Sequence, residues 1–357
     1  MNSAATVALA PLAGLYGAAM KARRALYQRG LLRVHETGIP VISIGNITTG
    51  GTGKTPLVEW IAGELARRNR QVCILTRGYG RAHADRRVIV SNRSEILSNA
   101  ETSGDEAMLL AERLQGRAAV ISDTDRVAAA HWAIENLGSD VLVLDDGFQH
   151  LRLARSLNLV TIDATNPWGS RRLLPAGSLR EPLDELARAD CVVITRANDP
   201  GRSEELQREI DQLSNQAVVL RSRMVTCGLR SVGSCSNNLD SLVAPAQFEP
   251  TPMAAFCGIG NPKSFFAQLQ HDGYQLCHMQ AFRDHHSYTQ TDLDRLVRDS
   301  IACGAQTLLT TAKDEVKLRS LRLDLPCYVA DIAIEIEDEE KLQRLIDEAI
   351  RTRARPN

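Results

Sequence analysis

The sequence predicts an α/β protein in which a parallel-sheet domain is followed by a second, smaller α/β domain. Three observations predict this fold. A Gly-rich loop lies between an apolar strand and a helix, strands and helices alternate up to about residue 195, and a polar, irregular stretch at 228–252 precedes a second run of alternation. We expect a division into an N-terminal membrane-associating helix at 1–35, a first domain at 36–225, a linker or hinge at 226–252 and the smaller domain at 253–357.

The N-terminal segment differs in composition from the rest of the chain. Residues 4–20 are mostly apolar or small, five basic residues follow by position 33, and no carboxylate precedes Glu36. A cleaved signal peptide carries its basic residues ahead of the apolar run, and a membrane-spanning helix needs about 20 apolar residues. An apolar, basic helix lying in the membrane interface fits better, with an Ala-rich helix packed on the protein itself as the alternative.

Apolar runs of strand length and helical patterns follow this segment in turn. Residues 40–45 and 71–76 read as buried strands, and 56–66 between them has apolar residues at helical spacing. A strand, a helix and a strand of this length predict a right-handed βαβ unit and therefore a parallel sheet. The alternation continues with helices from 103 to 114 and from 126 to 137, and with strands at 118–122, 140–144, 157–163 and 190–195.

The Gly-rich loop is the strongest chemical signal. Its glycines allow the positive φ angles and the close backbone approach that bring several N–H groups to a triphosphate, and the helix that follows points its N-terminus at the same anion. The amino-acid sequence of this loop is similar to the xGGxGK[ST] motif of MinD-like ATPases, which usually carry lysine at the position of Thr49. The loop predicts a P-loop NTPase-like domain that binds ATP and Mg²⁺, with Lys54 on the β and γ phosphates and the Thr55 hydroxyl on the metal. The expected ATP-binding residues are Thr48, Thr49, Gly50, Gly51, Thr52, Gly53, Lys54 and Thr55.

Two adjacent carboxylates end an apolar strand about 90 residues downstream. Asp145 and Asp146 would repel each other unless a cation lay beside them, so we expect one of them to hold Mg²⁺. Gln149 and His150 follow at the sheet edge where open α/β folds bind ligands.

Two further segments could supply a base for a phosphoryl acceptor. Asp105 opens a helix after a glycine, which suits either a general base or a helix cap. Asp284, His285 and His286 form a run in which a carboxylate could fix a histidine tautomer, and the run fits either a catalytic site or a solvated loop.

The overall charge and the cysteine positions limit the kinds of partner and site expected for this chain. A net charge of −1 and a pI near 6.7 argue against a nucleic-acid-binding protein. The eight cysteines show no CxxC pair, and several lie in apolar runs, which favours buried reduced thiols over a metal site or a disulfide framework.

Taken together, these segments resemble the tetraacyldisaccharide 4′-kinase family, the lipid A 4′-kinases of Gram-negative bacteria. The matching residues are Gly45-Asn46-Ile47-Thr48 with Gly50-Gly51-Thr52-Gly53-Lys54-Thr55-Pro56, Thr76-Arg77-Gly78-Tyr79-Gly80, Gly104-Asp105-Glu106, Asp145-Asp146-Gly147-Phe148-Gln149-His150, Leu174-Pro175-Ala176-Gly177-Ser178-Leu179-Arg180-Glu181-Pro182, Asp284-His285 and Thr310-Thr311-Ala312-Lys313-Asp314. The family usually has glutamate at the position of Ala312.

The resemblance implies transfer of the ATP γ-phosphate to the 4′-hydroxyl of tetraacyldisaccharide 1-phosphate, at the cytoplasmic face of the inner membrane. It implies that Asp105 acts as the base and that His285 assists it from the smaller domain. Glu106 could join Thr55, Asp145 and Asp146 around the metal. The residues expected to hold the sugar or its phosphate are Arg77, Gln149, His150 and Arg180, since arginine suits bidentate phosphate binding.

The alternative function is a MinD-like regulatory ATPase or GTPase that cycles on membranes. The sequence of the Gly-rich loop and the N-terminal segment favour the regulatory ATPase, whereas Asp105 and the Asp284-His285 segment favour a kinase.

Overall fold

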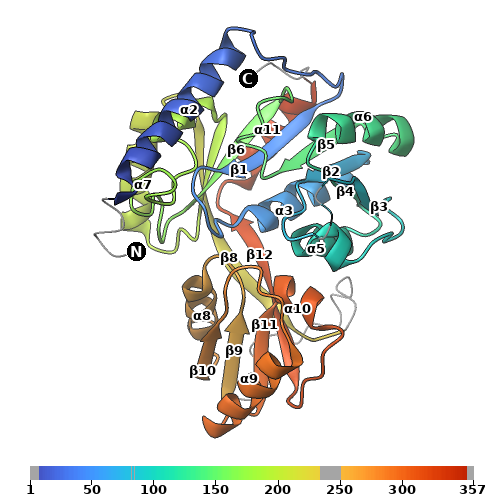
Figure 1. Ribbon diagram of the computed structural model, residues 1–357, viewed down its shortest axis with the longest axis vertical. Helices are drawn as coiled ribbons and strands as arrows, with labels where there is room; N and C mark the ends of the chain where they lie inside the picture. Colours follow the sequence, from blue (N-terminus) through green and yellow to red (C-terminus); the bar gives the residue numbers. More distant parts are fainter. Residues whose placement is uncertain (1–7, 82, 84, 234–250, 352–357) are drawn as a thin grey trace. The chain divides into compact units, whose positions relative to one another are not determined.

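The computed structural model describes residues 8–81, 83, 85–233 and 251–351. Contacts divide the chain into two compact units, coloured along the sequence in Figure 1. The first unit comprises Met1–Arg77, Asp125–Arg223 and Ile336–Asn357, and the second comprises Gly78–Thr124 and Met224–Glu335. Residues 78–124 therefore group with the C-terminal part of the chain, although they lie inside the sequence range expected for the first domain.

The first unit is built on a parallel sheet with the strand order β8-β7-β6-β1-β5-β2. Every residue of the inner strands is buried, as expected for a parallel sheet covered on both faces. The register pairs Ile44 with Asp145, so the loop after β1 and the acidic end of β5 emerge side by side at the same edge. The strands are β1 (Val41–Asn46), β2 (Val72–Thr76), β5 (Val141–Asp145), β6 (Leu157–Asp163), β7 (Cys191–Thr195) and the first part of β8 (Val218–Ser231).

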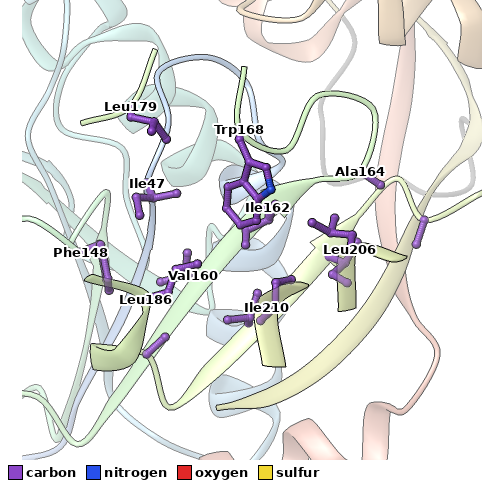
Figure 2. Close-up of a cluster of buried hydrophobic side chains, with 14 residues drawn as sticks. Ile47, Phe148, Val160, Ile162, Ala164, Trp168, Leu179, Leu186, Leu206 and Ile210 are labelled. Carbon is purple, nitrogen blue, oxygen red and sulfur yellow. The ribbon is translucent and has the colours of Figure 1, made fainter. Parts of the chain in front are cut away.

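A large cluster of buried hydrophobic side chains covers one face of this sheet (Figure 2). Val160 and Ile162 of β6 pack with Leu206 and Ile210 of α7, and Trp168 from the loop after β6 completes the cluster at 2% exposure. These residues follow the periods of a strand and a helix, so each element buries one apolar face. The helices of the unit are α2 (Ala10–Gln28), α3 (Lys54–Arg67), α6 (Arg126–Leu137), the 3-10 helix η1 (Leu183–Arg188), α7 (Pro200–Leu213) and α11 (Glu339–Arg351).

Helix α2 packs on the first unit by one face and exposes leucines elsewhere. Tyr16 donates a hydrogen bond to the Arg180 carbonyl at 2.7 Å, and Arg24 forms an ion pair with Glu185 at 3.0 Å. Leu12 and Leu15 lie one turn apart and are 53% and 69% exposed. None of the helices in the described part of the chain has the length and apolar character needed to span a bilayer.

The second unit contains another parallel sheet, with helices on both of its faces. Its strand order is β10-β9-β11-β12 followed by the second part of β8. Along β9, Ala254 and Phe256 pack with α9, whereas Ala255 and Cys257 pack with α8. The elements are β8, β9 (Met253–Cys257), α8 (Pro262–His271), β10 (Leu276–Ala281), α9 (Gln290–Ala302), β11 (Thr307–Thr311), α10 (Ala312–Leu318) and β12 (Cys327–Ile336).

Residues 78–124 add the remaining elements of the second unit. Strands β3 (Val88–Ser91) and β4 (Ala118–Ser122) pair antiparallel, and the short helix α4 (Ala100–Ser103) leads into α5 (Asp105–Arg113). Two ion pairs join α5 to other parts of the unit, Arg113 with Asp331 and Glu112 with Arg319. This segment therefore packs through α5 rather than as an isolated insertion.

The structure confirms the predicted fold class, since α/β architecture with a parallel sheet occurs in both units. One stretch differs from the expectation. Residues 228–231, predicted to be irregular, continue strand β8. Their polarity is misleading because Arg230 is 1% exposed and pairs with Glu315 and Asp331 inside the protein. Residues 234–250, which make up most of the predicted linker, and residues 1–7 of the N-terminal segment lie outside the described residues.

Candidate active site

The phosphate loop lies between β1 and α3 in the first unit. Gly50 and Gly53 have φ angles of +111° and +81°, which glycine adopts without strain, and Gly53 caps the helix that begins at Lys54. Thr52 is buried at 4% exposure, and its hydroxyl accepts a hydrogen bond from Asn46 at 3.0 Å. The backbone N–H of Thr49 donates to the Ser178 carbonyl at 2.7 Å. The loop is thus fixed from both sides while its helix terminus favours an anion.

Asp146 lies between two cations in the same unit. Its carboxylate is 3.3 Å from Lys54 Nζ and accepts two hydrogen bonds from Arg180 Nη1, at 2.8 and 2.9 Å. Burial opposes ionisation, but the charges of Lys54 and Arg180 prevail and lower the pKa of Asp146. Lys54 and Arg180 carry two positive charges beside the single negative charge of Asp146. The cluster is therefore net positive, which favours the binding of a polyphosphate.

Asp145 has a different environment from its neighbour. It is 3% exposed, and its Oδ2 accepts a hydrogen bond from Thr76 Oγ1 at 2.9 Å, which ties β5 to β2. The next residue, Asp146, turns away at φ +52°, a conformation that aspartate tolerates better than most residues. The two acids therefore face different partners.

The donor set at this edge fits Mg²⁺. Thr55 and the two aspartates offer hard oxygen ligands, and the lowered pKa of Asp146 keeps its carboxylate charged. Residues 8–81, 83, 85–233 and 251–351 contain no group of three or more His, Cys, Asp or Glu side chains placed to hold a metal ion together. Mg²⁺ takes one or two carboxylates and completes its shell with phosphate oxygens and water.

The second unit brings Asp105 and His285 together across 180 positions of the sequence. His285 Nδ1 lies 3.0 Å from both carboxylate oxygens of Asp105, which is 7% exposed. Asp105 is the first residue of α5. Gly104 before it has a φ of +91°, and a β-carbon at this position would collide with the Tyr79 carbonyl oxygen. His285 itself adopts a φ of +57°. Backbone turns at both ends therefore aim the two side chains at each other.

The pKa values of this pair move in opposite directions. Burial opposes ionisation of Asp105, but the hydrogen bond with His285 and the charges of Lys313 and Lys317 lower its pKa overall. The hydrogen bond with Asp105 raises the pKa of His285 despite burial and the nearby Lys313. Each partner favours the charged form of the other.

Two lysines of α10 complete this cluster, and the sequence reasoning assigned them no role. Lys313 Nζ lies 2.9 Å from Glu106, 3.2 Å from His285 Nε2 and 3.3 Å from Asp284. Burial lowers the pKa of Lys313, but the carboxylates around it, Glu106 first, raise the pKa overall. The sequence signal for Lys313 was the Thr310–Asp314 segment, whereas Lys317 lies three residues beyond that segment and had no motif to mark it.

The predicted metal and base residues thus fall into two clusters. Asp145, Asp146 and Thr55 belong to the first unit, whereas Glu106 belongs to the second and pairs with Lys313. The sequence pattern predicts Asp105 and His285 in different domains, 36–225 and 253–357, whereas the two residues meet inside the second unit.

The four residues predicted to hold the sugar phosphate all belong to the first unit. Arg180 binds Asp146, and Gln149 Nε2 donates to the Asn46 carbonyl at 2.9 Å. Burial, followed by the charge of Arg126, lowers the pKa of His150 to about 3, so its imidazole is neutral at physiological pH. Arg77 follows β2 and is exposed.

Comparisons with known proteins agree on one family. The family model described as tetraacyldisaccharide-1-P 4′-kinase matches residues 5–351. A tetraacyldisaccharide 4′-kinase of Desulfotalea psychrophila is 39% identical over 326 residues, covering 90% of both chains. One of Anaeromyxobacter sp. (strain K) is 41% identical over 305 residues, covering 85% of this chain and 79% of the relative.

A solved structure supports the same assignment. The crystal structure of LpxK from Aquifex aeolicus in complex with ATP superposes with a TM-score of 0.75 at 30% identity, covering 97% of this chain and 99% of that one. The family model, the relatives and the solved structure all agree with a phosphate loop, an acidic strand end and a buried carboxylate in contact with an imidazole, and the chain belongs to the tetraacyldisaccharide 4′-kinase family.

Proposed function

We propose that this chain transfers the γ-phosphate of ATP to the 4′-hydroxyl of tetraacyldisaccharide 1-phosphate, a step of lipid A biosynthesis. The Asp105–His285 contact at 3.0 Å carries this proposal beyond family membership. A regulatory ATPase needs the phosphate loop, but only a kinase needs a buried carboxylate to receive the proton of an acceptor alcohol. The alternative of a membrane-cycling ATPase is not favoured, because a kinase family matches residues 5–351.

The chemistry divides between the two clusters. Lys54 and the loop N–H groups hold the β and γ phosphates. The acceptor hydroxyl loses its proton to Asp105 as its oxygen bonds to the γ-phosphorus, and the bond from that phosphorus to the ADP oxygen breaks. His285 orients the Asp105 carboxylate and stabilises its charge through Nδ1.

Mg²⁺ would be held by Thr55 and by a carboxylate of the Asp145–Asp146 pair, and Glu106 stays a further candidate ligand. When bound, the ion neutralises charge on the phosphate oxygens. Lys54 and Arg180 flank Asp146 and supply additional positive charge at the same sheet edge.

The sugar or its 1-phosphate would be held by residues of the first unit. Arg180 and Arg77 offer guanidinium groups suited to a phosphate. Gln149 and the neutral His150 offer hydrogen-bonding groups without a full charge.

Helix α2 would bring the enzyme to its lipid substrate as a peripheral protein on the cytoplasmic face of the inner membrane. Leu12 and Leu15 are exposed on α2, and basic residues follow them along the helix. Changing both leucines to Glu should reduce co-sedimentation with anionic vesicles. Ile301→Glu, at a 55% exposed apolar residue of α9, is the matched control and should leave vesicle binding unchanged. Equal loss in both variants would contradict the role of α2.

The activity is tested with purified protein, γ-labelled ATP and tetraacyldisaccharide 1-phosphate in detergent micelles. A kinase transfers label to the lipid and consumes little ATP without it. Rapid ATP hydrolysis that is independent of lipid, with no labelled lipid, would support the regulatory ATPase instead.

A further inference from the structure

Asp314 is a fully buried carboxylate to which neither the family resemblance nor the mechanism gives a role. Its Oδ2 accepts hydrogen bonds from the backbone N–H of Gly258 at 3.0 Å and from Thr311 Oγ1 at 2.7 Å. Lys317 Nζ, one helical turn along α10, lies 3.1 Å from Oδ1. A buried charge of this kind persists only with such partners, so the geometry around it is closely defined.

Gly258 connects Asp314 to His285. The Gly258 carbonyl accepts a hydrogen bond from the His285 N–H at 3.1 Å. A β-carbon on Gly258 would lie 3.1 Å from both the Arg283 carbonyl oxygen and Asp314 Oδ1, so the packing leaves little spare room. His285 takes its φ of +57° immediately beside this contact, and that strained backbone aims the imidazole at Asp105.

Lys317 connects the same carboxylate to the other half of the pair. Its Nζ lies 3.1 Å from Asp314 Oδ1 and 3.6 Å from Asp105 Oδ2, and the side chain is 13% exposed. Each residue therefore contacts the next in a closed ring of five: Asp105, His285, Gly258, Asp314 and Lys317. All five residues belong to the second unit.

We propose that Asp314 and Lys317 are positioning residues that hold His285 and Asp105, respectively, in the geometry for proton transfer. This rests on the proposed function, in which Asp105 is the base. Asp314 fixes the backbone turn of His285 through Gly258, and Lys317 fixes the Asp105 carboxylate. A displacement of about 1 Å at a reacting group costs about 100-fold in rate, which sets the expected size of the effect.

The test is a pair of double-mutant cycles on kcat for lipid phosphorylation. Asp314→Asn should lower kcat about 100-fold in the wild-type background and about twofold or less when His285 is already Ala, with the KM for ATP unchanged. Lys317→Met should show the same dependence on Asp105, losing its effect when that residue is Asn. Losses that multiply in both cycles would overturn the proposal.

A second variant guards against simple misfolding, because Asp314→Asn leaves Lys317 with less compensation. Gly258→Ala removes no charge and pushes the added methyl group against Asp314, the Arg283 carbonyl and the Tyr288 hydroxyl. It should also lower kcat, and its effect should also vanish in the His285→Ala background. A Gly258→Ala enzyme with unchanged kcat would overturn the proposal.

The matched control lies on the same short helix. Glu315 is 1% exposed and pairs with Arg230, so Glu315→Gln also disturbs a buried ion pair of α10. Its effect on kcat should multiply with that of His285→Ala. If Glu315→Gln couples to His285 as strongly as Asp314→Asn does, a general shift of α10 explains the data and the proposal fails.

The outcomes separate this proposal from the proposed function. A wild-type protein that phosphorylates no lipid refutes the function. A wild-type kinase that loses activity on Asp105→Asn, yet shows multiplicative losses for Asp314→Asn and His285→Ala, keeps the function and refutes the positioning role.

Discussion

Replacing Asp105 by Asn tests the base directly while preserving the shape of the site. The amide oxygen still accepts a hydrogen bond from His285 Nδ1, so the contact at 3.0 Å can persist. Lys317 keeps Asp314 at 3.1 Å, and Lys313 keeps Glu106 at 2.9 Å, so neither cation is left unpaired. The substitution therefore removes the proton acceptor and its charge, with little loss of packing.

The expected magnitude follows from these contacts. General base catalysis contributes about 100- to 10,000-fold, and kcat should fall by that factor, or about 2.7–5.5 kcal/mol in activation free energy. The KM for ATP should stay within about twofold of wild type, because Lys54 and the phosphate loop belong to the first unit. The stability loss should be well under the roughly 3–5 kcal/mol typical of breaking a buried ion pair.

The assay is initial-rate transfer of labelled phosphate to the lipid, with ATP varied at saturating lipid. The matched control is Asp292→Asn, which alters a second carboxylate–imidazole pair of the same unit, Asp292 with His286 at 3.2 Å. That variant should keep kcat. An Asp105→Asn enzyme with wild-type kcat, or an equal loss in Asp292→Asn, would refute the assignment of Asp105 as the base.

Three further predictions follow from the charges and the core. Lys54→Met should lower kcat about 100-fold or more in the same assay, since it removes a phosphate-facing cation and leaves Asp146 with fewer compensating charges; an active variant would contradict its role. The pKa of His285 is raised by Asp105, so its stabilising contribution is complete below the unfolded pKa of about 6.5 and is lost as pH rises through the folded pKa. The loss of unfolding free energy in His285→Gln, measured with urea, should therefore be largest near pH 5–6 and shrink towards pH 9; a pH-independent difference would contradict this. Trp168→Ala should destabilise the first unit by about 3–5 kcal/mol in urea unfolding, because the indole is 2% exposed, and a loss under about 1 kcal/mol would contradict the packing.

The parallel sheet and the phosphate loop of the first unit could be predicted from the sequence because their signals are local, whereas residues 78–124 of the expected first domain group with the second unit. An apolar strand, a glycine loop and a helix with Lys54 at its start specify one another over about twenty residues. The parallel sheet then follows from the βαβ rule, and it brings Asp145 beside the loop through the pairing of β5 with β1.

The second cluster could not be derived from local pattern. Asp105 and His285 are 180 positions apart, and Asp105 at a helix start looks like an ordinary cap. Only the family resemblance paired them. Their meeting depends on residues 78–124 joining the C-terminal part of the chain in one unit, a tertiary arrangement for which strand and helix periods give no signal.

Buried charge explains the remaining misses. Gly228 and the polar residues from Gly233 onward predict an irregular stretch over the end of β8, whereas the ion pairs of Arg230 with Glu315 and Asp331 allow this arginine to be buried in the strand. Lys313 and Lys317 carry no chemical signal of their own in the sequence, since a lysine on a short helix is usually a solvated residue.

The most direct test of the central claim is to identify the product. Wild-type protein incubated with ATP and tetraacyldisaccharide 1-phosphate should yield a lipid heavier by one phosphate, with ³¹P NMR placing the new phosphomonoester at the 4′ position and one ADP formed per phosphate transferred. Release of free phosphate with no phosphorylated lipid, or a new phosphate elsewhere on the disaccharide, would contradict the account.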